Sequence, residues 1–275
     1  IKPRLKSSFL QRLRATEWPL RWVGGLLSVL LIVLFAWFFM NGSLSGSLSD
    51  SSEPVLEIGS IETSSKDNAV MVYVPAGEFV MGSEADDPNA YRNEKPPHLV
   101  YLDAFWIDQT EVTNAMFARF IEETAHQTEA KQAGYGFVYQ PSTDNWEETN
   151  GADWTHPVGP ENSIIGLEHY PVVQVSWNDA TAYCAWAERR LPTEAEWAYA
   201  CRGGSQESHY FWWGNDFMEG KGRLNISAVD FLPGKNTVWP LANAPWSDGF
   251  AFLSPVDQYG ERGRNGFGLA DMCGG

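Results

Sequence analysis

The feature that most constrains this chain is a 19-residue segment, residues 22–40, which is uncharged and almost wholly apolar. A helix of that length rises about 30 Å, the thickness of the hydrocarbon core of a bilayer. Because no polar break divides the segment, we expect a transmembrane helix rather than a buried core helix. Six Lys or Arg residues precede it and the next cation is Lys66. The positive-inside rule therefore places residues 1–21 in the cytoplasm and everything after Met40 outside.

A cleaved signal peptide is the competing interpretation of this segment. Its apolar core would be shorter and would be followed by small residues at a cleavage site. The Gly- and Ser-rich stretch after Asn41 keeps this alternative open. Both interpretations place the remainder of the chain outside the cytoplasm.

The charge distribution argues against a nucleic-acid partner. The whole chain has a formal net charge of −16, although residues 1–40 hold six cations against the single acid Glu17. The part after residue 40 is thus strongly acidic, and it lacks the basic patch that phosphate binding requires. Calcium or basic peptide segments are more suitable partners.

Composition divides the acidic part into a tether and one folded domain. Residues 41–69 are rich in Ser, Gly and acids without an apolar period, which predicts a flexible linker. We expect the folded domain to cover residues 70–275. The β-branched run at residues 70–74 predicts a strand, and residues 79–81 are expected to pair with it as a hairpin.

Three helices are predicted by their N-terminal caps. Thr113 precedes a helical spacing of apolar residues, Ser176 precedes a stripe that includes Tyr183 and Cys184, and Thr193 with Glu196 forms a capping-box pattern. Because burying a large ring is the commonest use of tryptophan, we expect Trp177, Trp186 and Trp197 to pack in the core.

Six segments of this chain resemble, in order, the formylglycine-generating-enzyme family of sulfatase-modifying factors. They are residues 74–83 (VPAGEFVMGS), 105–120 (FWIDQTEVTNAMFARF), 151–163 (GADWTHPVGPENS), 171–204 (PVVQVSWNDATAYCAWAERRLPTEAEWAYACRGG), 213–215 (WGN) and 265–275 (NGFGLADMCGG). The resemblance implies an α+β domain of low regular secondary structure, distantly similar to C-type lectins.

The resemblance also implies an activity. Characterised members oxidise a cysteine within a CxPxR-like motif of a sulfatase polypeptide to formylglycine, using dioxygen and copper(I) held by two cysteines near the C-terminus. Those cysteines would follow Gly275, so no residue here inherits a catalytic role. Since the sequence starts at Ile1 and stops directly after a patterned run, we expect it to be part of a longer protein, and inactive as it stands.

The three cysteines are expected to serve the structure. The resemblance implies that Cys184 and Cys201 form disulfides with partners in the absent segment, which an oxidising compartment permits. Cys273 lies in an apolar run flanked by glycine, and we expect it to be a small buried side chain.

Calcium is the metal that the resemblance assigns to this chain. It implies a first site from the side chains of Asn225 and Asp248 with the carbonyls of Ile226 and Phe250. Asp271 and the Gly274 carbonyl would begin a second site, whose remaining ligands are absent. Hard oxygen donors of this kind suit calcium, although a single Asp or Asn, taken without the resemblance, is more often a solvated turn residue.

Two functional hypotheses remain. The first is the oxidoreductase, in which Trp154, Phe137 and Tyr139 line a peptide groove or simply pack. The second is a non-catalytic extracytoplasmic sensor or binding module of the same fold, with residues 1–21 as the tail of a cytoplasmic signalling domain. A fold does not by itself confer an activity.

Overall fold

The computed structural model describes residues 56–88, 90–140, 142–143, 145–205, 209–226 and 244–274. They belong to one compact unit, residues 55–275. The predicted cytoplasmic segment, the apolar segment 22–40 and most of the tether lie outside the described residues. Among the helices that are described, none has the length and apolar character needed to cross a membrane.

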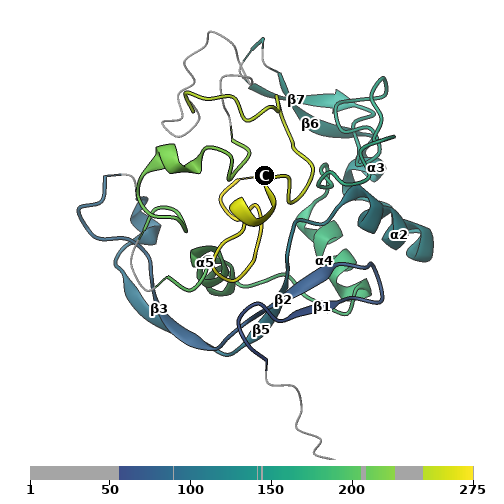
Figure 1. Cartoon of the computed structure of the whole chain (residues 1–275). Helices are drawn as coiled ribbons and strands as arrows, with labels where there is room; N and C mark the ends of the chain where they lie inside the picture. Colours follow the sequence, from purple (N-terminus) through teal and green to yellow (C-terminus); the bar gives the residue numbers. More distant parts are fainter. Residues whose placement is uncertain are drawn as a thin grey trace, which may run out of the picture. The chain divides into compact units, whose positions relative to one another are not determined.

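Two small antiparallel sheets form one side of the unit (Figure 1). The first has the order β1-β2-β5, from β1 (Ile61–Thr63), β2 (Val70–Val74) and β5 (Phe105–Asp108). The second pairs β3 (Gly77–Met81) with β4 (His98–Leu102), so that Phe79 lies opposite Val100. Alternation along β2 buries Val72 and Val74.

The predicted hairpin between residues 70–74 and 79–81 is wrong. β2 is paired along one edge by β1 and along the other by β5, so neither edge is left for β3. The fold also begins earlier than residue 70, because β1 lies within the predicted tether. Its three side chains are exposed and it is held by backbone pairing, which gives no apolar period to detect.

The three predicted helices and their caps are confirmed. Thr113 caps α2 (Asn114–Thr124), while Ser176 with Asp179 and Thr193 with Glu196 form complete capping boxes on α4 (Trp177–Trp186) and α5 (Glu194–Arg202). Further elements had no prediction. These are the 3-10 turns η1 (Arg92–Glu94), η2 (Phe217–Gly220) and η3 (Gly260–Arg262), helix α3 (Glu129–Ala133), and the hairpin of β6 (Tyr135–Gln140) with β7 (Asn145–Asn150).

One carboxylate joins the starts of two helices. Asp179, which is 1% exposed, accepts a hydrogen bond from the Ser176 amide at 2.9 Å and so closes the capping box of α4. The same carboxylate accepts from the amide of Glu129, the first residue of α3, at 3.2 Å. Its other oxygen lies 2.8 Å from Nε2 of His126. The loop between α2 and α3 is therefore fixed to the N-terminus of α4.

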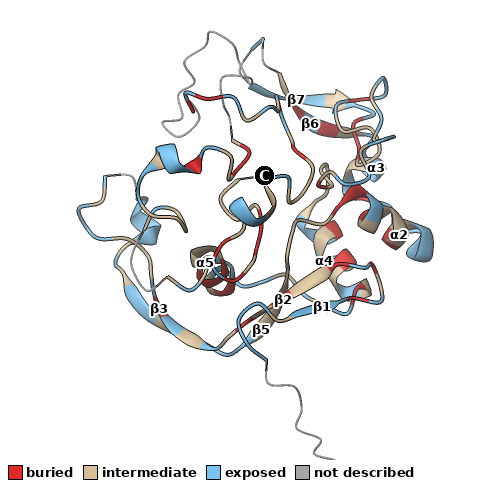
Figure 2. Ribbon diagram, viewed as in Figure 1, coloured by how far each residue is buried: buried red, intermediate tan, exposed pale blue. Residues whose placement is uncertain are grey.

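Two apolar clusters hold these elements together (Figure 2). The first joins the sheets to α5 and to the C-terminal residues, through Val72, Val74, Phe79, Tyr199, Ala200, Phe267 and Leu269. The second lies between α2 and α4, where Phe117, Phe120 and Tyr183 are in mutual ring contact.

The expected burial of the tryptophans is wrong at two positions. Trp177 is 71% exposed and Trp197 is 49% exposed, whereas Trp186 packs against Phe120. Trp177 is the first residue of α4, and its side chain is not among those that pack in the cluster between α2 and α4. Trp154 packs edge-to-face on Phe117, and Phe137 is 53% exposed on β6.

Candidate functional site

The four residues expected to form the first calcium site come together, although 22 positions separate Ile226 from Asp248. One oxygen of the Asp248 carboxylate accepts from the Ile226 amide at 2.9 Å, and the other accepts from the Phe250 amide at 3.0 Å. Asn225 is 5% exposed and donates its side-chain NH₂ to the Phe252 carbonyl at 2.8 Å. A carboxylate that accepts two hydrogen bonds keeps lone pairs for a cation, so this donor set fits calcium.

Beside the second expected set lies a buried acid, Glu111, that the sequence analysis did not find. Asp271 accepts from the Asp257 amide through Oδ2 at 2.7 Å, while its Oδ1 is buried and has no hydrogen-bond partner among the described residues. Oε2 of Glu111 is buried and unpaired in the same way. Burial, and then the charge of Asp271, raise the pKa of Glu111 to about 7. Two unsatisfied acidic oxygens in one place fit a shared proton or a bound cation.

The two expected calcium sets are in contact with each other. A β-carbon placed on Gly274 would lie 2.5 Å from the carbonyl oxygen of Asn225. Tyr259 also connects the two sets. Its buried hydroxyl has no hydrogen-bond partner within the part of the chain that the structure describes. Burial together with the charges of Asp248 and Asp271 raises the pKa of Tyr259 to about 12. The C-terminal residues thus pack directly against the first site. This proximity was not predictable from either motif alone.

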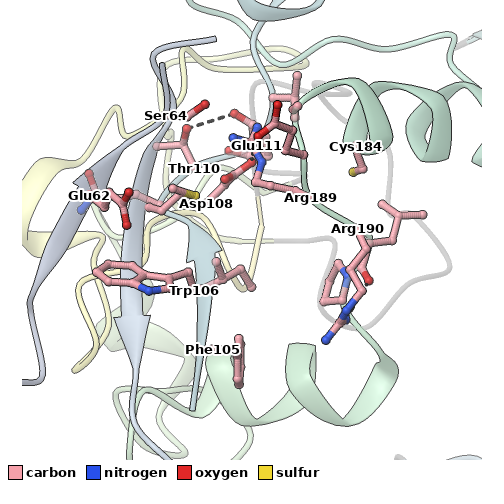
Figure 3. Close-up of a pocket in the computed structure, with 18 of the residues that line it drawn as sticks. Glu62, Ser64, Phe105, Trp106, Asp108, Thr110, Glu111, Cys184, Arg189 and Arg190 are labelled. Carbon is pink, nitrogen blue, oxygen red and sulfur yellow. Dashed lines mark hydrogen bonds and ion pairs between the residues drawn. The ribbon is translucent and has the colours of Figure 1, made fainter. Parts of the chain in front are cut away.

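A cavity of about 780 Å³ lies beside Glu111 and Asp271. Its wall includes Asp108 at the end of β5, Glu111 and Asp271, with Cys184 and Arg189 from the end of α4 and the residues that follow it (Figure 3). Trp197 contributes its exposed ring to the same wall, which accounts for its exposure. The wall is therefore partly acidic and partly apolar.

A charged network fixes one side of the cavity. Arg189 donates to both oxygens of Asp67, Tyr183 donates to the same carboxylate, and Asp108 lies 3.4 Å from Arg189. Burial alone would raise the pKa of Asp67, but the hydrogen bonds from Arg189 and Tyr183 outweigh it and lower the pKa to about 2. Asp108 has the opposite balance, because burial outweighs the charge of Arg189 and raises its pKa to about 6.

All three cysteines carry free thiols in this structure. Cys184 lines the cavity, and burial followed by the charge of Asp108 raises its pKa, which makes it a weak nucleophile at neutral pH. Cys201 and Cys273 are partly buried, with sulfur atoms 3.9 Å apart. Cys273 is thus not the fully buried side chain that we expected. The disulfides that the resemblance implies for Cys184 and Cys201 remain predictions.

The two expected calcium sets offer side-chain and backbone oxygen atoms, which are the ligands that hard cations prefer. Within the described ranges, no three His, Cys, Asp or Glu residues converge as metal ligands, so a bound ion would need amide or carbonyl oxygens as well. Calcium takes oxygen donors of that kind, whereas copper(I) takes soft thiolates. Structural calcium at these residues stays a prediction.

Comparison with known proteins agrees with the motifs. The family model of the sulfatase-modifying factor enzyme 1-like domain matches residues 57–275. The chain is 39% identical over 221 residues to the formylglycine-generating enzyme of Bos taurus, covering 74% of this chain and 55% of that protein. It is 37% identical over 235 residues to the inactive C-alpha-formylglycine-generating enzyme 2 of Mus musculus, covering 80% of this chain and 70% of that one.

A solved structure has a similar fold. PvdO from Pseudomonas aeruginosa has a TM-score of 0.54 and 28% identity, over 78% of this chain and 71% of PvdO. The fold is thus the mixed α and β fold of formylglycine-generating-enzyme-like proteins. The chain belongs to the family of sulfatase-modifying factor enzyme 1-like domains. It spans about half the length (55%) of the bovine relative.

Proposed function

We propose that this chain is part of a formylglycine-generating oxidoreductase that acts on a sulfatase-type polypeptide. The observation that carries the proposal is the match of residues 57–275 to the family, together with the identity to the bovine enzyme. The substrate would be a cysteine in a CxPxR-like motif, and the oxidant would be dioxygen. Two further cysteines beyond Gly275 would complete the active site.

Copper(I) is the proposed redox cofactor of that complete site. We assign copper(I) to the two cysteines that would follow Gly275 and not to the described ones. Cys184 lines the cavity with a raised pKa, and the neighbouring thiols of Cys201 and Cys273 are not among the residues that line the cavity. We therefore assign no step to copper on this chain. The proposed task of residues 57–275 is to build the scaffold, which calcium at Asn225, Ile226, Asp248 and Phe250 would stabilise.

The proposed activity can be assayed with the natural full-length protein. Purified protein loaded with copper(I) is incubated under dioxygen with a peptide that contains a CxPxR-like motif, and the peptide is analysed by mass spectrometry. We expect conversion of the cysteine to formylglycine, and none in a matched peptide with serine at that position. A folded, copper-loaded protein that leaves the cysteine peptide unchanged would exclude the oxidoreductase.

The alternative is a non-catalytic sensor or binding module outside the cytoplasm, joined to a cytoplasmic signalling domain. The observation that favours it is the identity to the inactive paralogue of Mus musculus. This hypothesis predicts binding of the cysteine peptide without chemical change. Isothermal titration of peptide into the same protein separates the two functions, since binding with no conversion supports the module.

Membrane anchoring is part of the same proposal. Residues 22–40 would span the bilayer, with residues 1–21 in the cytoplasm. A reporter that is active only outside the cytoplasm, fused after Asn41, should be active. The matched control replaces the six N-terminal cations by Gln, which should weaken the orientation. A cytoplasmic reporter signal in the natural sequence would contradict this topology.

A further inference from the structure

One face of the hairpin of β6 and β7 carries a row of aromatic rings. Alternation along β6 places Tyr135, Phe137 and Tyr139 on this face, and the register adds Trp146, which lies opposite Tyr139. Phe137 packs edge-to-face on Tyr135 and Trp146 packs edge-to-face on Tyr139. Phe137 is nevertheless 53% exposed and Trp146 is 68% exposed. We call these four residues the aromatic face; most of β7 beside them is also exposed (Figure 2).

The opposite face of the hairpin is occupied by the protein itself. Val138 is buried there, and a β-carbon on Gly136 would lie 2.3 Å from the side-chain oxygen of Gln174. Gln174 also donates to the carbonyls of Phe137 and Pro157, at 2.9 and 2.8 Å. The hairpin therefore cannot turn over to bury its rings without breaking these contacts. Exposed aromatic side chains on a strand pair that is fixed in this way are typical of a protein-binding surface.

A carboxylate stands beside these rings. Glu148 lies opposite Phe137 in the register, so the two side chains project from the same face. Glu148 is exposed and has no hydrogen-bond or ion-pair partner within the described part of the chain. A free carboxylate next to an aromatic ring attracts a cation, because it pairs with the charge while the ring adds a cation–π interaction. Arginine suits such a surface best, since its planar guanidinium pairs with carboxylates and stacks on rings.

We propose that the aromatic face docks an extended basic segment of a partner polypeptide, with an arginine side chain on Phe137 and Glu148. The inference rests on the proposed function, in which the partner carries a CxPxR-like motif. Alternate residues of an extended segment project from one side about 6.8 Å apart, which is also the spacing of the rings along β6. The proline and the arginine of the motif alternate in this way and would lie on neighbouring rings.

Binding of a labelled peptide to the natural full-length protein tests the docking. The peptide has serine in place of the motif's cysteine, so fluorescence anisotropy measures the dissociation constant without conversion. Glu148→Gln should raise this constant roughly two- to fivefold, since one exposed ion pair is lost. Glu147→Gln is the matched control, because it removes the same charge from the neighbouring residue, which lies on the other face of β7. No binding to the natural protein, or equal effects of the two substitutions, would overturn the inference.

A charge exchange tests whether residue 148 contacts the arginine directly. The natural protein should bind the arginine peptide more tightly than a peptide with glutamate at that position, and Glu148→Lys should reverse this order. Glu147→Lys carries the same net charge and should keep the natural order. Reversal in both variants would mean that only the overall charge matters, and reversal in neither would mean that the arginine binds elsewhere; each result overturns the inference.

The contribution of the rings is measured with a second pair of variants. Trp146→Ala should raise the dissociation constant roughly threefold to tenfold. Trp177→Ala removes a ring of similar exposure, 71%, from α4 and should leave the constant unchanged. Thermal unfolding of each variant confirms that it is folded. Equal dissociation constants in folded Trp146→Ala and Trp177→Ala would overturn the inference.

The conversion assay on the cysteine peptide separates this inference from the proposed oxidation. Conversion by the natural protein, with peptide binding unaffected by Glu148→Gln and Trp146→Ala, would exclude the docking face and leave the oxidoreductase in place. Weaker binding in both variants, with no conversion by the natural protein, would support the docking face and exclude the oxidoreductase.

Discussion

Gly274 packs so closely on the carbonyl oxygen of Asn225 that a β-carbon at residue 274 would stand 2.5 Å from it. Replacing Gly274 by Ala must therefore displace Asn225 or the C-terminal loop. We expect Gly274→Ala to cost about 1–3 kcal/mol, as overpacking usually does. It should also reduce any stabilisation by calcium. Chemical denaturation with and without calcium measures both effects.

Gly59→Ala is the matched control for that experiment. No atom of the described residues lies within 4 Å of a β-carbon at residue 59, although the φ of 88° at Gly59 favours glycine. The variant should lose about 1 kcal/mol from backbone strain and keep its full response to calcium. Equal calcium responses in Gly274→Ala and Gly59→Ala would show that the packing of Gly274 does not affect calcium binding.

Calcium should stabilise the natural protein through Asp248. With free calcium at about 100 times the dissociation constant, mass action raises the free energy of unfolding by roughly 2.7 kcal/mol. Asp248→Ala should abolish most of this gain, because Asp248 accepts from both Ile226 and Phe250 at the centre of the set. The exposed Asp103 is the control, and Asp103→Ala should keep the gain. Thermal unfolding of the natural protein and of both variants, with calcium and with chelator, measures these gains.

The buried ion pair of Asp67 and Arg189 should be costly to break. The two side chains are 0% and 16% exposed, and removing Arg189 leaves Asp67 and Asp108 without their cation. We expect Arg189→Ala to lower the free energy of unfolding by about 3–5 kcal/mol. Lys66→Ala removes the exposed ion pair between Lys66 and Glu188, whose charged atoms are 3.8 Å apart. It should change the free energy of unfolding by less than about 1 kcal/mol. A loss of stability in Arg189→Ala as small as that in Lys66→Ala would show that the network of Asp67, Arg189 and Asp108 does not stabilise the fold.

Asp108 should make stability fall as the pH rises. Its pKa is raised from 3.8 to about 6, so the folded protein holds this proton more tightly than the unfolded chain does. The stabilisation is complete below pH 3.8 and is lost as the pH passes through about 6. Asp108→Asn should remove this dependence of stability on pH. At pH 7 its free energy of unfolding should be about 1–3 kcal/mol higher than that of the natural protein. Asp103→Asn should retain the dependence on pH.

Local signals were readable in the sequence and distant contacts were not. A cap and the residue three positions later lie in one turn, so Ser176 with Asp179 predicted the start of α4 correctly. Arg189 and Asp67 are 122 positions apart, and no spacing rule connects them. Glu111 escaped notice for the same reason, since its significance depends on Asp271. The pairing of β3 was mispredicted because β2 takes both of its partners from elsewhere in the chain.

The single carboxylate of Asp179 makes the start of α3 depend on the start of α4 in local unfolding. Asp179 lies on α4 and accepts from the amides of Glu129 and Ser176, so opening the start of α4 removes the acceptor of both amides. In hydrogen–deuterium exchange the Glu129 amide should therefore have an opening free energy no greater than that of the Ser176 amide. The two helices are coupled in this way although more than 40 residues of sequence separate them. Asp179→Asn should accelerate both exchange rates by a similar factor.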